Sequence, residues 1–143
     1  MTNDEQQTDP EPQEGAQEEP QFIYRSLDAF VTEYLCVVVR RPVGGGHLAW
    51  CPEWWQHPEA IARLAALWRA FEYLSQDPGL GMTSWWLHHA DPHLAALMHP
   101  DKGPFAYCSG PDGHTDTLGE LPYVPSPPEL WDNPAFSLDA TQP

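Results

Sequence analysis

Two cysteine–histidine pairs with the same spacing are the residues best suited to chemistry in this chain. Five residues separate Cys51 from His57, and five separate Cys108 from His114. Thiolate and imidazole are the ligands of tetrahedral structural zinc, and two of each complete the set. An ion bound with on the order of 10 kcal/mol would match the whole stability of so small a domain. Cys51, His57, Cys108 and His114 therefore form our hypothesis for a structural zinc site.

The same spacing leaves a second interpretation open. Five residues between cysteine and histidine is not one of the usual zinc-finger spacings, and the chain has no Cys-x2-Cys motif. Cysteine is also among the residues most often buried without a metal. Each pair could instead be a buried thiol beside a loop histidine. The third cysteine, Cys36, should project away from the apolar stripe of its helix.

A second group of possible metal ligands is His88, His89, Asp91 and His93. On an unbroken helix, His89 and His93 would share one face, as in metalloprotease helices. We expect Pro92 to interrupt that helix, and Ala90 stands where the metalloprotease motif has glutamate. Asp91 is then explained as a helix N-cap. A metal-dependent enzyme using this His/Asp cluster with Cys51 or Cys108 is kept as an alternative function.

No complete catalytic motif is visible elsewhere. Ser84 lacks the G-x-S-x-G context of a nucleophile elbow, and Gly44-Gly45-Gly46 lacks the Lys-Ser/Thr of a phosphate-binding loop. We therefore assign no catalytic and no cofactor-binding residues, and we favour a non-enzymatic protein while keeping the metal-dependent enzyme as the alternative.

The candidate ligands flank a segment with strong helical periodicity. It begins at Pro58, which suits a first helical position. Glu59 and Arg63 should pair along it, as should Arg69 and Glu72. The apolar residues recur every three or four positions and predict one buried helical face: Ile61, Leu64, Leu67, Trp68, Phe71 and Leu74. An earlier helix should run from about Leu27 to Arg40 with Ser26 as its N-cap, and two short helices should follow the central one.

These elements predict a mainly α protein, a small bundle of three to four helices. We divide the chain into a disordered acidic tail (residues 1–21), a helical domain (22–110) and an irregular Pro-rich segment (111–143). The net charge of the chain is −15, of which the tail supplies −7 and the remainder −8. Only six residues are Lys or Arg, too few for a direct nucleic-acid-binding surface. An acidic DNA mimic that inhibits a DNA-binding protein is a further alternative function.

The sequence shows no signal peptide and no apolar run of the ~20 residues that a membrane span needs. We expect a cytoplasmic protein, whose thiols stay reduced. Near the C-terminus, Leu121–Phe136 reads LPYVPSPPELWDNPAF and predicts extended, polyproline-like chain. Tyr123, Leu130, Trp131 and Phe136 would either dock on the domain or bind a protein partner.

Several motifs together resemble a known family. WCPEWWQHPEA followed by ARLAALWRAFEYL, then WWLHHADPH and GPFAYC, resembles domain-of-unknown-function family 4913 over about Tyr24 to Cys108. The family has no established activity that the resemblance would transfer to any residue. It implies a setting in high-GC bacteria and their mobile DNA elements: plasmids, integrative elements or phages. We therefore favour a non-enzymatic accessory or adaptor protein that acts through protein contacts.

Overall fold

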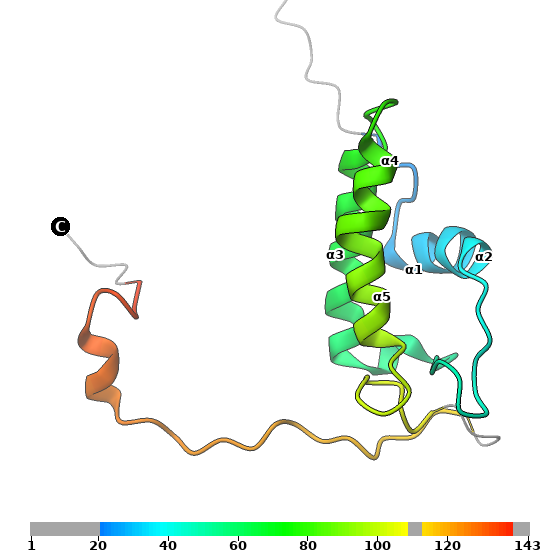
Figure 1. The fold of residues 1–143 in the computed structure, drawn as a ribbon. Helices are drawn as coiled ribbons and strands as arrows, with labels where there is room; N and C mark the ends of the chain where they lie inside the picture. Colours follow the sequence, from blue (N-terminus) through cyan, green and yellow to red (C-terminus); the bar gives the residue numbers. More distant parts are fainter. Residues whose placement is uncertain (1–20, 109–112, 139–143) are drawn as a thin grey trace, which may run out of the picture.

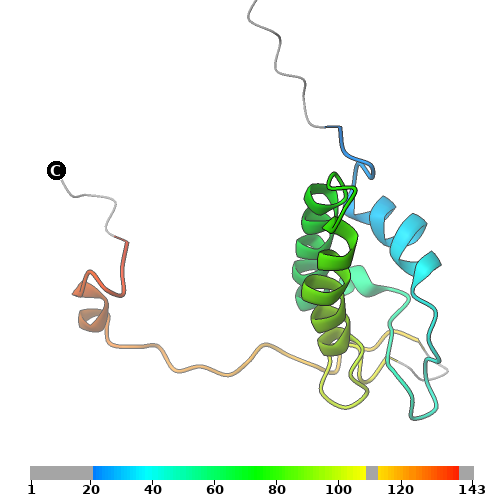
Figure 2. The same cartoon turned by 45° about the horizontal axis from the view of Figure 1, so that its top comes forward.

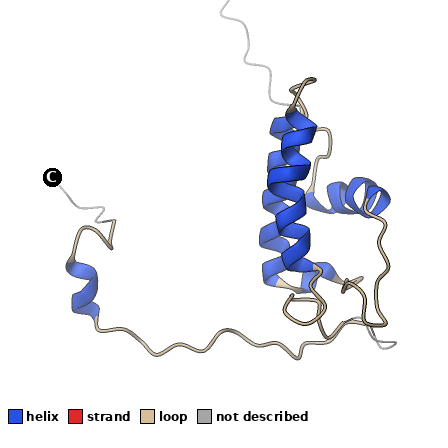
Figure 3. Ribbon diagram, in the orientation of Figure 1, coloured by secondary structure: helices blue, strands red, loops and turns tan. Residues whose placement is uncertain are grey.

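The structure is a computed structural model that describes residues 21–108 and 113–138. Within these ranges the protein is mainly helical and contains no β-strand (Figure 3). The predicted fold class is therefore confirmed in its main feature. The predicted disorder of the acidic tail falls on residues outside the described ones, except for Gln21.

The first helix is continuous from residue 27 to residue 38. It comprises α1 (Leu27–Ala29), a π-helical segment η1 (Phe30–Leu35) and α2 (Cys36–Val38). Its predicted N-cap is confirmed, because Ser26 Oγ accepts a hydrogen bond of 3.0 Å from the backbone N–H of Ala29. The helix ends two residues before the predicted Arg40. The Arg40 Nε–H donates to the carbonyl of Val37 at 3.0 Å and satisfies one of the last helical acceptors.

The central helix α3 (Pro58–Leu74) follows a short 3-10 turn, η2 (Trp54–Gln56). It begins at Pro58 as predicted, and the Glu59–Arg63 ion pair forms at 2.9 Å. The buried face consists of Ala60, Leu64, Leu67, Phe71 and Glu72. This face is rotated from the predicted one, which included Ile61; that side chain is exposed.

A second long helix lies antiparallel beside α3 (Figures 1 and 2). It joins α4 (Gly81–Ser84), the π-helical segment η3 (Trp85–Ala90) and α5 (Asp91–Leu97) without a break. The predicted interruption at Pro92 is wrong. Pro92 has no N–H, and in a regular α-helix its ring would clash with the carbonyl four residues earlier. The wider π turn changes the register: the Asp91 N–H bonds to the Trp86 carbonyl, five residues back, and the helix continues.

The core between the first helix and the two long helices is rich in aromatic rings. The ring of Phe71 lies 5.3 Å from Phe30 and 5.5 Å from Trp85, measured between centroids. Trp85 is fully buried and donates its indole N–H to the Leu67 carbonyl at 2.9 Å. The hairpin between the two long helices needs glycine at position 81, because a Cβ there would lie 1.8 Å from the Leu74 carbonyl oxygen. The close approach of Gly81 to the end of α3 therefore fixes where the second long helix begins relative to α3.

Glu72 has a different role from the predicted surface pair with Arg69. Its carboxylate is buried and accepts hydrogen bonds of 2.8 Å from the backbone N–H groups of Ile23 and Tyr24. The indole N–H of Trp68 donates to the same carboxylate at 3.2 Å. The predicted pairing with Arg69 is therefore wrong, and Glu72 instead attaches the chain before α1 to the central helix.

Replacing Glu72 with glutamine should destabilise the protein. The amide group would turn a donor toward backbone N–H groups that need an acceptor, and it would carry no charge. Hydrogen bonds to a charged group are each worth about 1.5–3 kcal/mol, so we expect Glu72→Gln to lower the free energy of unfolding by about 2–3 kcal/mol. Urea unfolding measures the change. Glu33→Gln, on the exposed face of the first helix, is the matched control and should change stability by less than about 0.5 kcal/mol; equal losses would contradict this role.

Beyond the helices, residues 113–138 run along one end of the domain and then away from it (Figure 1). This segment is irregular except for a 3-10 turn, η4 (Pro128–Asp132). Leu121 and Val124 are each 88% exposed, so this part of the segment is not packed on the domain. No helix in the described ranges has both the length and the apolar character to cross a membrane.

Candidate metal centre

The four predicted zinc ligands come from two loops at one end of the helical hairpin. Cys51 belongs to the loop before α3, which is tied to the end of α5 by a hydrogen bond of 2.9 Å from Ala49 N–H to the Met98 carbonyl. His57 is the residue immediately before α3. Cys108 ends a turn after α5, where its N–H bonds to the Phe105 carbonyl at 2.9 Å. His114 follows in the first part of the C-terminal segment.

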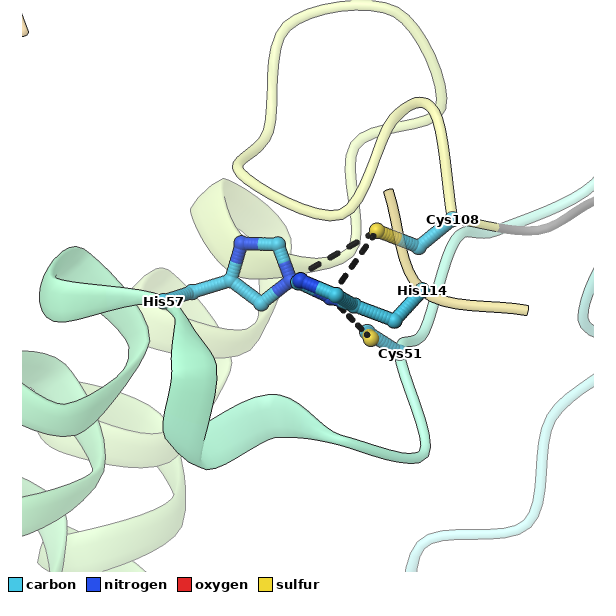
Figure 4. A group of neighbouring side chains, drawn as sticks. All are labelled: Cys51, His57, Cys108 and His114. Carbon is cyan, nitrogen blue, oxygen red and sulfur yellow. Dashed lines mark hydrogen bonds between the residues drawn. The ribbon is translucent and has the colours of Figure 1, made fainter. Parts of the chain in front are cut away.

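The side chains of all four residues converge on one point (Figure 4). Cys51 Sγ lies 3.3 Å from His114 Nδ1, and Cys108 Sγ lies 3.5 Å from His57 Nε2. Cys108 Sγ is also 3.9 Å from His114 Nδ1. One ligand atom from each of the four residues lies within 4.8 Å of the other three. The structure thus brings together the complete set of residues that the sequence proposed.

These separations resemble the edges of a zinc tetrahedron. Zinc binds thiolate at about 2.3 Å and imidazole nitrogen at about 2.0–2.1 Å, so a tetrahedral angle places sulfur and nitrogen about 3.5 Å apart. The observed sulfur–nitrogen distances of 3.3, 3.5 and 3.9 Å bracket that value. An S–H···N hydrogen bond has a similar length, but it joins only two groups, whereas here four come together. The geometry therefore fits an ion shared by all four side chains.

Asp116 orients one of the histidines. Its Oδ1 lies 2.6 Å from His114 Nε2, so the proton of the imidazole is held on Nε2. The lone pair on Nδ1 then points at the two sulfur atoms. A carboxylate that holds the second nitrogen of a histidine ligand is a frequent outer-shell feature of zinc sites, where it fixes the tautomer and raises the basicity of the ligand.

Backbone N–H groups face both sulfur atoms. The N–H of Thr115 donates to Cys108 Sγ at 3.5 Å, and a backbone hydrogen bond from Glu53 reaches Cys51. Such bonds favour the thiolate over the thiol, because the charged form accepts them more strongly. At Cys51 this hydrogen bond partly opposes the effect that burial has on the pKa of the thiol.

Burial dominates the acid–base properties of the site. It raises the pKa of the Cys51 thiol to about 11; the Glu53 backbone hydrogen bond opposes this increase and the neighbouring Cys108 adds to it. Burial also lowers the pKa of His57, with a further decrease from His114 and an opposing effect of Asp116. His57 is thus neutral near pH 7, the form that binds metals, whereas Cys51 must release a proton when a cation binds.

Aromatic side chains cover the side of the cluster that faces the protein core. Phe105 is fully buried, and its ring lies 5.1 Å from both Trp50 and His57. Cys51 and Cys108 are buried as well, and the histidines are half-buried. The ligand atoms therefore lie at the boundary between the core and the C-terminal segment, where water has little access.

The second predicted group does not assemble into a metal site. Among the described residues, only Cys51, His57, Cys108 and His114 form a group of metal-binding geometry. Asp91 is exposed, has helical backbone angles and makes no capping hydrogen bond, so its predicted role as an N-cap is wrong. The ring of His93 lies 3.1 Å from the Arg63 guanidinium, and burial, Arg63 and His89 together lower the pKa of His93.

The residues that support the cluster were not predicted from the sequence. Asp116 stands two positions after His114, and this proximity of a carboxylate to a histidine ligand is the one signal that could have identified it. The contribution of Phe105 and of the Thr115 and Glu53 backbone groups depends on loop conformation. Their positions around the cluster could therefore not be predicted from the sequence.

Fold and site together define a small, mainly helical protein with a two-cysteine, two-histidine cluster at one end of a helical hairpin. The chain belongs to the family described as Domain of unknown function (DUF4913), which matches residues 24–127. The resemblance noted in the sequence is thereby confirmed, and the match extends past Cys108 to include His114 and the start of the Pro-rich segment. No curated protein and no solved structure matches the chain.

Proposed function

We propose that this protein is a non-enzymatic accessory protein with a structural zinc site, and that it acts through protein contacts made by its C-terminal segment. The convergence of Cys51, His57, Cys108 and His114 carries the proposal. A tetrahedral site with two sulfur and two nitrogen ligands suits zinc, which has no redox chemistry and no geometric preference of its own.

The ligand count supports a structural rather than a catalytic ion. Catalytic zinc sites keep one position for water or substrate, whereas four protein side chains fill every position of a tetrahedron. The bound ion would join the loop before α3 to the start of the C-terminal segment. Its role would be structural: it would be bound by both cysteine thiolates and both imidazoles and would fix the point at which residues 117–138 leave the domain.

The contact role is supported by the exposure of that C-terminal segment. Its large apolar side chains, including Tyr123 at 81% and Phe136 at 68%, lie in solvent rather than on the domain. Exposed apolar groups of this kind commonly mark interaction sites. A cytoplasmic location, which we also propose, would keep the cluster thiols reduced and able to bind zinc. The proposed setting on mobile DNA elements rests on the family resemblance.

The distribution of charge along the chain does not favour the alternative function as an acidic DNA mimic. Residues 22–108 contain eight acidic and six basic residues, a net charge of −2. The other −13 of the chain's −15 lies in the two terminal segments. A folded surface that imitates DNA needs regular negative charge on the domain itself, and this domain is nearly neutral.

Metal analysis of the purified chain tests the zinc site. Protein prepared without chelator should contain one zinc per chain, and Cys51→Ser and Cys108→Ser should each lose it. Cys36→Ser is the matched control, because Cys36 is exposed and lies outside the cluster, so it should keep full occupancy. A chain ending at Thr117 should also keep the zinc while losing protein partners in affinity capture. A wild-type chain without metal, or a Cys51→Ser chain that retains it, would contradict the zinc site.

A further inference from the structure

An open apolar pocket, separate from the four cluster residues, lies between the first helix, the loop after it and the end of α5. Its cavity volume is about 170 Å³. Ligand and cofactor sites usually occupy 300–1,000 Å³, whereas an apolar cavity of about 150 Å³ accommodates a single benzene ring. This pocket therefore has the size for one aromatic side chain. Its apolar walls are Leu35, Val39, Val43, Trp50, Leu94 and Met98.

Basic residues lie beside this pocket. Arg41 lines both the pocket and an adjoining open hollow, which Arg40 and His47 also line. All six Lys and Arg residues of the chain lie between positions 25 and 102, and two of them are at this corner. An occupant of matching chemistry would present an aromatic side chain flanked by carboxylates.

The chain itself carries such an element in η4. Trp131 and Leu130 are about half exposed, and Glu129 and Asp132 flank them. Residues 113–138 contain four acidic residues and no Lys or Arg. The turn is held in shape: the Trp131 indole N–H donates to Ser126 Oγ at 2.8 Å, and the Ser137 hydroxyl donates to the Trp131 carbonyl. This order reduces the entropy lost when the element binds.

The linker keeps this element away from the pocket of its own chain. Residues 117–127 include Pro122, Pro125 and Pro127, and a proline-rich linker of this length extends roughly 30 Å. Both views of the ribbon show η4 standing apart from the helices (Figures 1 and 2). A stiff, extended linker favours binding to another molecule over folding back.

We infer that Trp131 of one chain inserts into the Leu35–Trp50–Met98 pocket of a second copy, with Glu129 and Asp132 facing Arg41. Two copies that exchange their C-terminal segments form a closed, symmetric dimer in which each pocket is filled. This inference rests on the proposed contact role of the segment and names its partner. The zinc site fixes the base of the exchanged arm, because His114 and Asp116 immediately precede the linker.

Sedimentation velocity of the zinc-loaded full chain over a wide range of concentrations tests the dimer. We expect wild type to dimerise and Trp131→Ala to raise the dissociation constant at least about thirtyfold, the effect of removing an aromatic hot spot. Tyr73→Ala is the matched control, because this exposed aromatic residue lies on α3, outside both the pocket and the C-terminal segment, and it should dimerise like wild type. Zinc content and helical circular dichroism of each variant show that the fold is intact.

A charge exchange tests the pairing of the two surfaces. Arg41→Glu and Glu129→Arg should each dimerise more weakly than wild type, because each places like charges together. An equimolar mixture of the two variants restores opposite charges in both pockets, so it should form heterodimers with at least about tenfold higher affinity than either variant alone forms homodimers. Failure of the mixture to recover affinity would contradict this pairing.

Cys36 lines the pocket and is exposed, so its thiol reports whether the pocket is filled. Its alkylation should slow as wild-type concentration rises and should be independent of concentration in Trp131→Ala. Protection at every concentration in a monomer would show that the pocket takes its own segment and would overturn the inference. A monomer that captures another protein only when residues 118–138 are present would also overturn it, while leaving the proposed contact role and zinc site in place.

Discussion

Cys51→Ser and Cys108→Ser should each lower the melting temperature of the protein by well over ten degrees. Removing one thiolate from a four-ligand site loses much of the binding free energy of the ion, which is on the order of 10 kcal/mol. A loss of only about 3 kcal/mol lowers the melting temperature of a domain of 60–100 residues by roughly 12–24 °C. Thermal unfolding followed by circular dichroism, with and without chelator, measures this effect. Chelator should bring wild type down to the variants and leave the variants unchanged.

The double variant separates a shared ion from independent hydrogen bonds. If one ion links both thiols, Cys51→Ser with Cys108→Ser should be scarcely less stable than either single variant, because the first change already removes the ion. Cys36→Ser should alter stability by less than about 0.5 kcal/mol. Small, additive losses that chelator does not affect would instead assign each sulfur to a separate hydrogen bond with its histidine.

Trp85→Ala should be the most damaging substitution away from the metal site. Trp85 is fully buried where the first helix meets the two long helices, and it contacts both Phe30 and Phe71. Truncating a buried aromatic residue to alanine costs about 3–5 kcal/mol, and the indole hydrogen bond to Leu67 is lost as well. Total stability is only about 5–15 kcal/mol, so this variant should be largely unfolded under mild denaturing conditions.

Two further variants show which property of Trp85 matters. Trp85→Phe keeps an aromatic ring and loses the N–H donor, so we expect a smaller loss of about 1–3 kcal/mol. Trp55→Ala is the control for tryptophan loss, because Trp55 is 56% exposed, and it should cost less than about 1 kcal/mol. Urea unfolding monitored by circular dichroism ranks the three. Equal losses for Trp55 and Trp85 would contradict the placement of the core.

Local signals in the sequence predicted the helices well. The first helix and α3 were identified from apolar periodicity, and their starts from Ser26 and Pro58, because a cap or a first-turn proline acts within one turn of chain. The same local signals gave a wrong prediction at Pro92, where a break in the helix was expected. The predicted interruption at Pro92 assumed a regular α-helix. In the structure, the π-helical segment η3 precedes Pro92 and accommodates it, and nothing in the local sequence indicated that segment.

Long-range contacts set the limit of what the sequence could predict. Glu72 stands three residues from Arg69, which indicated a surface pair, yet its carboxylate binds backbone groups 48 and 49 residues earlier. For the metal site, residue type and the repeated spacing identified all four cluster residues. The distances among them depend on how the two loops fold, and apart from η2 the described residues of those loops form no helix or strand from which a geometry could be derived.

The separation of Cys51 and His114 along the chain, 63 residues, has a consequence for biosynthesis. A nascent polypeptide emerging from the ribosome exposes Cys51 and His57 first, and two ligands alone form an incomplete site. The second pair emerges only after the whole helical hairpin, whose antiparallel packing brings the two loops to the same end. At the proposed zinc site, capture of the ion would therefore be completed late in synthesis, after both long helices have emerged, and a chain that ends before His114 would lack one of the four ligands.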